Sequence, residues 1–350
     1  MASPARPKAI STIREFDLIR ALQQRHGAGD SSILRGIGDD AAVVAPSKNL
    51  WQLLTTDLLA EGIHFDLRTA AWSDIGFRAI AANLSDIAAM GGTPQYLLVA
   101  LAIPLDGTGR QVHQLYSGMM KACRPYSVRL IGGDISASAQ GWIISITLIG
   151  SVLPRRALLR SGARVGDSLY VTGTIGDSRA GLELLQRSRG KKGAASFSAT
   201  HRHYLIQRHL RPTARVKFGR WLSTHQWATS AIDVSDGLSG DLRHICEESR
   251  VGAEISLSAL PLSPACRAYG KSTGQDPTTL ALAGGEDYEL LFTVSSRRRR
   301  RFERMAIANH LQVTRIGTIR PARSGIHSLS PDGQRRTLPS KSYEHFRSKN

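Results

Sequence analysis

Residues 230–242 read SAIDVSDGLSGDL. The apolar run 230–234 predicts a strand, and the residues from 236 to 248 have the spacing of a helix. Two aspartates, Asp233 and Asp236, lie where the predicted strand ends and the predicted helix begins. The same alternation of short apolar runs and helical patterns continues along the chain, and it predicts an α/β or α+β fold.

The predicted elements cover most of the chain. Strands are expected at 41–44, 51–55, 96–103, 128–131, 142–152, 169–172, 230–234, 253–257, 288–294 and 313–318. Helices are expected at 11–25, 72–90, 108–123, 177–187, 213–224, 236–248 and 296–309. The stretch 187–200 is rich in Arg, Lys, Gly and Ser and is expected to form an exposed loop.

The length of 350 residues is enough for two domains of ordinary size, each with its own core. Hydrophobic residues make up 41% of the chain and charged residues 21%, which is typical of a globular protein and does not indicate disorder. The segment LPRR at 153–156 follows a long predicted strand. We therefore expect a domain boundary near residue 155, with one domain at 1–155 and the other at 156–350.

The chain is unusually basic, with a formal net charge of +18. A basic surface attracts polyanions of any kind, so nucleic acid has to be considered as a partner. The basic residues are nevertheless spread over the chain, and their one dense run, 297–301, is most simply interpreted as a solvated helix start. A genome-wide basic bias or an acidic partner would give the same excess, and the sequence does not choose between them.

The sequence also bears on the location of the protein. No apolar run approaches the roughly 20 residues that a membrane helix needs, and the first residues lack the apolar stretch of a secretory signal. We therefore expect a cytoplasmic protein with no membrane partner. Cys123, Cys246 and Cys266 are far apart and have no second ligand at metal-binding spacing, so they are expected to be free, buried thiols.

Acidic residues recur beside Gly, Ser or Thr at the borders of predicted elements. The six instances are GIGDD (36–40), TTD (55–57), NLSD (83–86), GGD (132–134), DVSDG (233–237) and GGED (284–287). Taken singly, each is more typical of a turn. Taken together, carboxylates at several strand ends can converge on one point, where they suit Mg²⁺ bridged to substrate phosphates, and the glycines let backbone N–H groups approach phosphate oxygens.

Asp86 is the sharpest of these cases. In the expected helix 72–90 it shares a stripe with apolar residues, and the opposite face is apolar too, which predicts that it is buried. An unpaired buried carboxylate costs several kcal/mol, so Asp86 should meet a cation, a metal or a set of donors. A helix cap or a salt bridge to an arginine would satisfy it equally well on helix position alone.

Other nucleotide-binding motifs are missing or weak. The chain has no Gly-x-x-x-x-Gly-Lys-Ser/Thr segment and no His-Arg-Asp catalytic loop of protein kinases. Residues 36–41 fit a Gly-x-Gly-x-x-Ala fingerprint only superficially, because two acids would repel a pyrophosphate unless metals intervene and a strand, rather than a helix, is predicted to follow.

The acidic segments belong to longer motifs that extend from residue 36 to residue 292. These are GIGDDAAVV (36–44), TTDLLAEGIHF (55–65), AANLSDIAAMGGTP (81–94), LIGGD (130–134), LLRSGARVGDSLYVTGTIGDSRAGL (158–182), AIDVSDGLSGDL (231–242) and GGEDYELLF (284–292). In this series the chain closely resembles the thiamine-monophosphate kinase family. The wider superfamily also contains aminoimidazole ribonucleotide synthetase, selenophosphate synthetase and a hydrogenase maturation protein.

The resemblance implies a two-domain α/β chain of the aminoimidazole ribonucleotide synthetase type. Its N-terminal domain, 1–155, would bind ATP and Mg²⁺ and form a homodimer through a β-barrel across the interface, and 156–350 would complete the active site. The implied reaction is ATP-dependent phosphorylation of thiamine monophosphate to thiamine diphosphate, the last step of thiamine diphosphate biosynthesis. Because the acceptor phosphate is already ionised, direct in-line transfer assisted by clustered Mg²⁺ is expected, without a covalent nucleophile. K⁺ is a candidate monovalent cofactor.

The resemblance also implies roles for individual residues. Implied metal ligands are Asp40, Thr55, Thr56, Asp57, Asp86, Asp134, Asp233 and Asp236. Implied ATP-binding residues are Gly133, Asp134, Arg160 and Ser235, and implied substrate-binding residues are His64, Glu286 and Tyr343. Considered without the family, His64 would be read as a loop histidine and Tyr343 as a packing residue near the chain end.

Two alternative functions are weighed against this one. Selenophosphate synthetase or the hydrogenase maturation protein would carry a reactive Cys near one end of the chain, whereas the cysteines here run from Cys123 to Cys266. A catalytically inactive, basic nucleic-acid-binding relative would be expected to have lost metal ligands, yet all eight implied ligand positions hold side-chain oxygens. Both alternatives are disfavoured.

Overall fold

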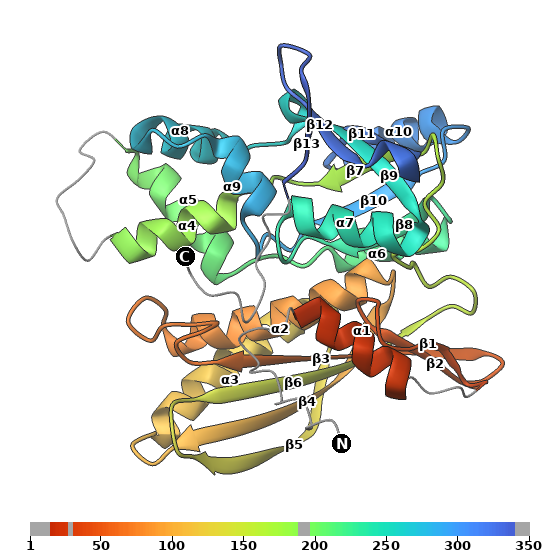
Figure 1. The fold of residues 1–350 in the computed structure, drawn as a ribbon. Helices are drawn as coiled ribbons and strands as arrows, with labels where there is room; N and C mark the ends of the chain where they lie inside the picture. The colour runs from red at the N-terminus through yellow and green to blue at the C-terminus, as the bar shows by residue number, and fades with distance from the viewer. Residues whose placement is uncertain (1–14, 27–30, 188–196, 340–350) are drawn as a thin grey trace, which may run out of the picture.

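The computed structural model describes residues 15–26, 31–187 and 197–339. The chain forms two α/β units, one around a sheet built from residues 33–152 and the other around a sheet built from residues 168–337 (Figure 1). Helix α1 (Glu15–His26) precedes the first sheet. The alternation of strands and helices predicted from the sequence is confirmed, while the boundary at residue 155 stays a prediction.

The first sheet has six strands in the order β1-β2-β3-β6-β4-β5. Neighbouring strands are antiparallel except β4 and β5, which are parallel, so the sheet is mixed. It is open in the single chain, with β1 and β5 at its edges. The bounds are β1 (Ile33–Arg35), β2 (Ala42–Ser47), β3 (Leu50–Ala60), β4 (Thr93–Pro104), β5 (Arg129–Ser138) and β6 (Ile143–Val152).

The inner face of this sheet is covered by α2 (Trp72–Ala89) and α3 (Gly109–Cys123), and a short 3-10 helix η2 (Arg124–Tyr126) follows α3 (Figure 1). Strand β6 alternates between buried and half-buried residues because one face packs against the helices. Ile144, Ile146 and Leu148 are fully buried on that inner face. Asp57 pairs with Ile146, which places the aspartate on the helix-covered face of β3.

Helices α2 and α3 cross with their backbones in close contact. A Cβ on Gly76 would lie 2.0 Å from the Leu115 carbonyl oxygen, and one on Gly118 would lie 1.9 Å from the Ser73 carbonyl oxygen. Only glycine fits at these two positions. The crossing therefore fixes the position of α2, whose opposite side faces the second unit.

The second sheet has seven strands in the order β13-β12-β9-β11-β7-β10-β8. Its pairs are antiparallel except β12 with β9, so this sheet is mixed as well. Every residue of β7 and β10 is buried, as expected for strands covered on both faces. The bounds are β7 (Ser168–Thr172), β8 (Ala228–Asp233), β9 (Val251–Ser256), β10 (Leu290–Val294), β11 (Val313–Pro321), β12 (Ile326–Leu329) and β13 (Arg335–Thr337).

Seven α-helices and two short 3-10 helices accompany the second sheet in the described part of the chain. They are α4 (Asp177–Arg187), α5 (Ala199–Leu210), α6 (Val216–Thr224), α7 (Leu238–Ser249), η3 (Leu257–Ala259), α8 (Pro264–Thr273), α9 (Pro277–Ala283), α10 (Arg299–Ala308) and η4 (Ala322–Ser324). Helices α5, α8 and α9 and strands β1, β12 and β13 were not predicted from the sequence. The predicted loop 187–200 lies mostly outside the described residues.

Several smaller predictions can be compared with the structure. The three cysteines are free and buried, as predicted, and burial raises the pKa of Cys123, Cys246 and Cys266 to about 12. The basic run does begin a helix, but two of its arginines have packing roles: the Arg298 and Arg301 guanidinium groups lie 4.6 and 5.8 Å from the Trp227 ring centre. None of the helices in the described ranges combines the length and apolar character of a bilayer crossing.

Candidate active site

A cavity of about 1370 Å³ lies between the two units. Its walls come from β3 and α2 of the first unit, from α4, α5 and α9 of the second, and from the loops 62–70 and 284–288. Arg78, Ala82 and Asp86 follow one another at intervals of four along the side of α2 that faces the cavity. A single helix therefore contributes to the cavity over more than two turns.

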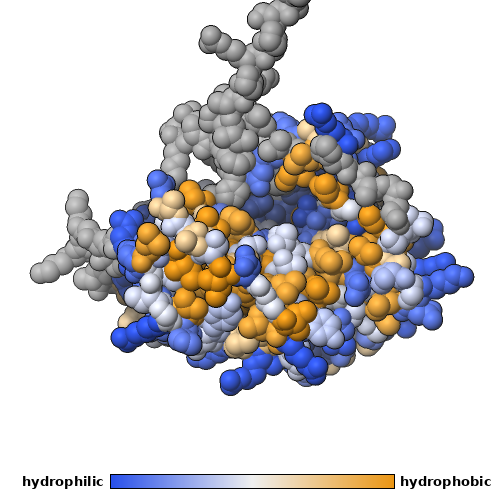
Figure 2. All heavy atoms as spheres, turned by 90° about the horizontal axis from the view of Figure 1, so that it is seen from below, coloured by the Kyte–Doolittle hydropathy of each residue, from blue (hydrophilic) through white to orange (hydrophobic). Residues whose placement is uncertain are grey.

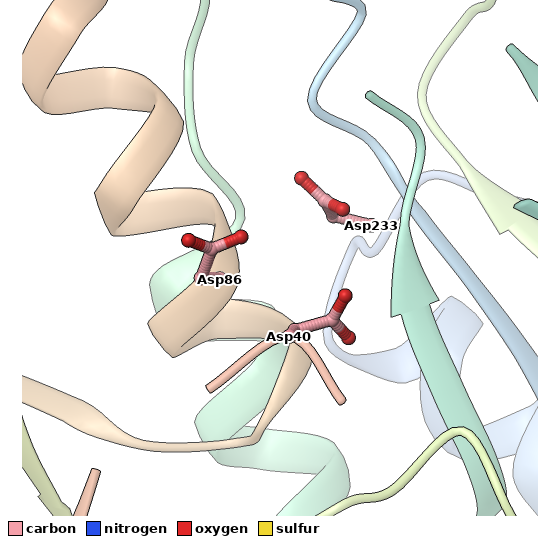
Figure 3. Close-up of side chains that lie close together, drawn as sticks. All are labelled: Asp40, Asp86 and Asp233. Atoms are coloured by element: carbon pink, nitrogen blue, oxygen red, sulfur yellow. The ribbon is translucent and has the colours of Figure 1, made fainter. Parts of the chain in front are cut away.

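Three aspartates converge at one end of this cavity (Figure 3). Asp86 projects from α2, Asp233 ends β8, and Asp40 lies just before β2. Each offers a carboxylate oxygen, and these oxygens all lie within 4.8 Å of one another. Residues separated by up to 193 positions in the sequence thus form one acidic cluster, defined here as Asp40, Asp86 and Asp233.

Neighbouring side chains orient the cluster. The Thr55 hydroxyl donates to Asp86 Oδ2 over 2.5 Å, and the Ser85 hydroxyl donates to Asp233 Oδ2 over 2.7 Å. The Arg160 guanidinium donates to Asp40 Oδ1 over 2.6 Å. The second Asp40 oxygen, Oδ2, is buried and has no hydrogen-bond partner among the described residues.

Burial and mutual repulsion make the cluster electrostatically costly. Burial, with the charges of Asp57, Asp233 and Asp40, holds the pKa of Asp86 well above its usual range. Burial also raises the pKa of Asp233 to about 7, with a further contribution from Asp40. A cation bound among these oxygens would offset both the cost of burial and the mutual repulsion. The unpartnered Asp40 oxygen is available as a ligand for such a cation.

Two more acids extend the negative end of the cavity. Asp57 on β3 has its pKa raised to about 6 by burial. Asp236 begins the turn into α7, and burial together with the charges of Glu15, Glu286 and Asp57 raises its pKa to about 7. Both line the cavity. With Asp39, which lines the cavity beside Asp40, six carboxylates therefore surround its acidic end, and Arg160 is the arginine that contacts the cluster.

The part of the cavity wall around Arg78 has a different character. The Arg78 guanidinium donates to His209 Nε2 over 2.8 Å, to Glu286 Oε2 over 3.3 Å and to the His64 carbonyl oxygen. His64 Nδ1 accepts from the Ala60 N–H over 3.0 Å, so a neutral His64 ring carries its proton on Nε2. This part of the wall combines a cationic donor, Arg78, with an anionic acceptor, Glu286, and a neutral acceptor, the His64 carbonyl.

The chain matches two protein-family models that together cover both units. Residues 38–152 match the AIR synthase related protein, N-terminal domain, and residues 164–329 match the AIR synthase related protein, C-terminal domain. These matches confirm the predicted two-domain α/β architecture, and the structure adds that both sheets are mixed.

Individual relatives are more specific. The chain is 38% identical to thiamine-monophosphate kinase of Bacillus subtilis, over 95% of this chain and 99% of that protein, and 40% identical to the Aquifex aeolicus protein of the same name, over 89% and 92%. The solved structure of AaThiL complexed with AMPPCP and TMP covers 97% of this chain and all of its own, with 36% identity and a TM-score of 0.83. The chain belongs to the thiamine-monophosphate kinase family. The selenophosphate synthetase and nucleic-acid-binding alternatives are not favoured.

Most site residues implied by the thiamine-monophosphate kinase resemblance lie together. Those that line the cavity are Asp40, Thr55, Thr56, Asp57, His64, Asp86, Arg160, Asp233, Ser235, Asp236 and Glu286. Two of them have contacts that the sequence does not suggest. The Thr56 hydroxyl donates to the Ile146 carbonyl across the sheet over 2.9 Å, and Arg160 contacts an acid of the cluster. Their individual roles stay predictions.

Gly133 and Asp134 do not line this cavity. They lie on the edge strand β5, where Asp134 pairs with Ala100, Ala100 with Ser145, and Ser145 with Leu58. The side chains of this row point to the outer face of the sheet, because adjacent rows point to opposite faces and the adjacent row contains Asp57 and the buried Ile146 on the helix-covered face. Tyr343, the third residue implied for the substrate, lies outside the described residues.

Arg78, His209 and Asp39 were not predicted as site residues, although Asp39 lies in the acidic segment GIGDD (36–40). Arg78 had a signal, since it is the one charged residue in the segment IGFRAIAANLS (75–85). His209 had none, because its contact with Arg78 spans 131 positions. Asp39 accepts from the Arg35 side chain and from the Asp40 N–H, and burial raises its pKa to about 7.

Proposed function

We propose that this protein transfers the γ-phosphoryl group of ATP to thiamine monophosphate and forms thiamine diphosphate. The observation that carries the proposal is the convergence of Asp40, Asp86 and Asp233 within 4.8 Å at one end of a cavity of about 1370 Å³. The family and the AaThiL complex with AMPPCP and TMP support the same reactants. We propose direct in-line transfer, because the acceptor phosphate is already ionised and needs no strong base.

The acidic cluster fits Mg²⁺. Its donors are carboxylate oxygens, which hard cations prefer, and one buried Asp40 oxygen lacks any other partner among the described residues. Asp40, Asp86 and Asp233 would hold the metal, with Asp57, Asp236, Thr55 and Thr56 as further oxygen ligands. Bound Mg²⁺ supplies positive charge that offsets the repulsion between two phosphate-bearing reactants.

The chain's own residues would position the reactants. Thr55 and Ser85 fix the directions of the Asp86 and Asp233 carboxylates, so the ligand oxygens are held before any substrate arrives. Arg160 and Ser235, which line the same end, are proposed ATP contacts. His64 and Glu286, which also line the cavity, are proposed contacts of thiamine monophosphate, together with Tyr343.

We also propose a homodimer. Apolar side chains gather on the face of the molecule below the first sheet (Figure 2), and Leu58 and Tyr96 are exposed on the outer face of its strands. A second copy that paired against this face would cover them and would form the intersubunit β-barrel that the resemblance implies. Asp134 lies on the same outer face, so its side chain could then reach nucleotide or metal only at the interface of a dimer.

Two further parts of the proposal concern the chain as a whole. We propose domains at 1–155, binding ATP and Mg²⁺, and at 156–350, completing the site; the two sheets lie on either side of this division. We propose a cytoplasmic location and K⁺ as a candidate monovalent cofactor.

The decisive test is an assay of the purified protein with ATP, Mg²⁺ and thiamine monophosphate, with thiamine diphosphate measured by chromatography. Isothermal titration of thiamine monophosphate in the presence of Mg²⁺ and a non-hydrolysable ATP analogue gives binding independently of turnover. Rapid-quench labelling with γ-labelled ATP should show no phosphoenzyme. If thiamine monophosphate neither binds nor is phosphorylated while another acceptor consumes ATP, the proposed function is wrong.

A further inference from the structure

Arg78 connects three parts of the cavity wall that are distant in the sequence. It is 5% exposed, and its guanidinium donates to the carbonyl of His64 in the 62–70 loop, to Glu286 in the 284–288 loop and to His209 on α5. Because the planar Arg78 guanidinium has a fixed geometry, its N–H groups hold the two loops and the helix in one relative position. Arg78 belongs to the first unit, while Glu286 and His209 belong to the second.

His209 completes the arrangement by accepting rather than donating at Nε2. A guanidinium can only donate, so the hydrogen bond of 2.8 Å requires a lone pair on His209 Nε2 and a proton on Nδ1. The Nδ1 atom lies 3.1 Å from the Ser178 hydroxyl and 3.4 Å from Glu286 Oε2. Burial lowers the pKa of His209 to about 4, which keeps the ring neutral near pH 7, as this arrangement needs.

The Glu286 loop has a backbone conformation that needs support. Glu286 has φ of 64° and Tyr288 has φ of 52°, and neither is glycine. A left-handed conformation costs roughly 1–2 kcal/mol for such a residue. Backbone N–H groups of Glu286 and Tyr288 donate to the carbonyls of Ser235 and Val234, and Arg78 holds the Glu286 side chain.

Arg78 is remote from the acidic cluster. It precedes Asp86 by eight residues on α2, which is about 12 Å along the helix axis at 1.5 Å per residue. Its guanidinium is engaged by Glu286, His209 and the His64 carbonyl, so its contacts are those of a support for the loops. Loss of Arg78 should therefore disturb the loops that carry His64 and Glu286 and leave the acidic cluster largely unchanged.

We infer that Arg78 and His209 are positioning residues that set the His64 and Glu286 loops for recognition of the phosphoryl acceptor. The identity of the acceptor, thiamine monophosphate, rests on the proposed function. The positioning itself does not, because it concerns how Arg78 and His209 hold two loops of the free protein.

The test compares Arg78→Gln, His209→Leu and His209→Gln with Arg211→Gln as a matched control. Arg211, directly after α5, also contacts α2 through a 2.6 Å ion pair with Asp74, but neither residue of that pair lines the cavity. His209→Gln keeps a side-chain acceptor for Arg78, whereas His209→Leu removes it. Circular dichroism and thermal melting establish that each variant is folded.

Steady-state kinetics gives the first measurement. Arg78→Gln and His209→Leu should raise the KM for thiamine monophosphate by about tenfold and leave the KM for ATP within about twofold. His209→Gln should lie near the wild type, and Arg211→Gln should change neither KM. Parallel rises in both KM values, or the same rise in Arg211→Gln, would show a general structural effect. An unchanged KM in His209→Leu would show that His209 does not position the acceptor loops. Each of these results overturns the inference.

Hydrogen exchange gives a second measurement that does not depend on activity. The His64, Glu286 and Tyr288 amides should exchange faster by about tenfold in Arg78→Gln than in the wild type or in Arg211→Gln. Unchanged exchange at these amides overturns the positioning role even if the variant loses activity. A wild type that does not phosphorylate thiamine monophosphate refutes the proposed function instead, and exchange still decides whether Arg78 holds the loops.

Discussion

Asp86→Asn separates the electrostatic role of the acidic cluster from its contribution to folding. The Asn side chain has nearly the same shape and keeps an oxygen that can accept the Thr55 hydroxyl, whose present hydrogen bond is 2.5 Å long. The substitution removes one negative charge from a group of three whose oxygens lie within 4.8 Å of one another. We expect turnover to be lost while the fold is retained.

The size of the effect follows from Coulomb's law. Two full charges 4.8 Å apart repel by about 3.5 kcal/mol at an effective dielectric constant of about 20. The raised pKa of Asp86 acts in the same direction, because protonation of this carboxyl relieves part of the repulsion. We therefore expect metal-free Asp86→Asn to be more stable than the wild type by about 1–3 kcal/mol at pH 8.

The assay is chemical denaturation at pH 8, with EDTA and with Mg²⁺, beside steady-state kinetics. Mg²⁺ should stabilise the wild type markedly more than Asp86→Asn, since ligand binding to the folded state raises its stability by mass action. The kcat/KM of the variant should fall at least about a hundredfold, the loss typical when one electrostatic stabiliser is removed. Asp106→Asn, which changes an exposed aspartate in the turn before α3, is the matched control and should behave like the wild type.

Two results would refute this reasoning. Equal stabilisation of the wild type and Asp86→Asn by Mg²⁺ would mean that Asp86 does not help to hold the metal. If metal-free Asp86→Asn is less stable than the wild type at pH 8, repulsion among the three carboxylates does not destabilise the folded protein. Asp86 would then contribute to stability as an ordinary hydrogen-bonded core residue.

Three further predictions concern stability. In EDTA, the unfolding free energy should fall as pH rises from about 4 to about 8, because folding raises the pKa of Asp233 and Asp236 from 3.8 to about 7. Their contribution to stability is full below pH 3.8 and is lost as pH rises through about 7. Urea denaturation at several pH values should therefore show that the unfolding free energy of Asp233→Asn depends less steeply on pH than that of the wild type. Gly118→Ala should destabilise by about 3 kcal/mol in thermal melting, since its Cβ would lie 1.9 Å from a carbonyl oxygen of α2, and an unchanged melting temperature would exclude the close crossing. Arg298→Gln should cost roughly 1 kcal/mol in the same experiment by removing a cation that lies 4.6 Å from the Trp227 ring centre, whereas Arg300→Gln, on the exposed side, should cost almost nothing.

The sequence was most informative where local pattern and chemistry coincide. Helix α2 was predicted almost to the residue, and Asp86 was identified on it because a carboxylate among apolar neighbours is costly unless it has a partner. Asp233 and Asp236 were identified because they lie where β8 ends and α7 is about to begin. Both inferences used only neighbours within a few turns.

The remaining features depend on contacts between distant parts of the chain. Strand β5 was predicted to end at residue 131 but continues to Ser138, and Gly133 allows its backbone to lie close against the Val99 carbonyl of β4. The face on which Asp134 lies is set by the pairing of β5 with β4, which composition does not reveal. Helix α5, with the sequence ATHRHYLIQRHL, has too little apolar contrast to be recognised without the core that it covers.

The placement of Arg78 and Asp86 on one helix limits how the gene can change. Inserting or deleting a single residue between them would rotate one side chain by about 100° relative to the other and would shift it by about 1.5 Å. The acidic cluster and the loops held by Arg78 would then no longer be aligned with each other. We expect natural variation in chain length among relatives to fall in the loops that flank α2, and α2 itself to keep a constant number of residues between these two positions.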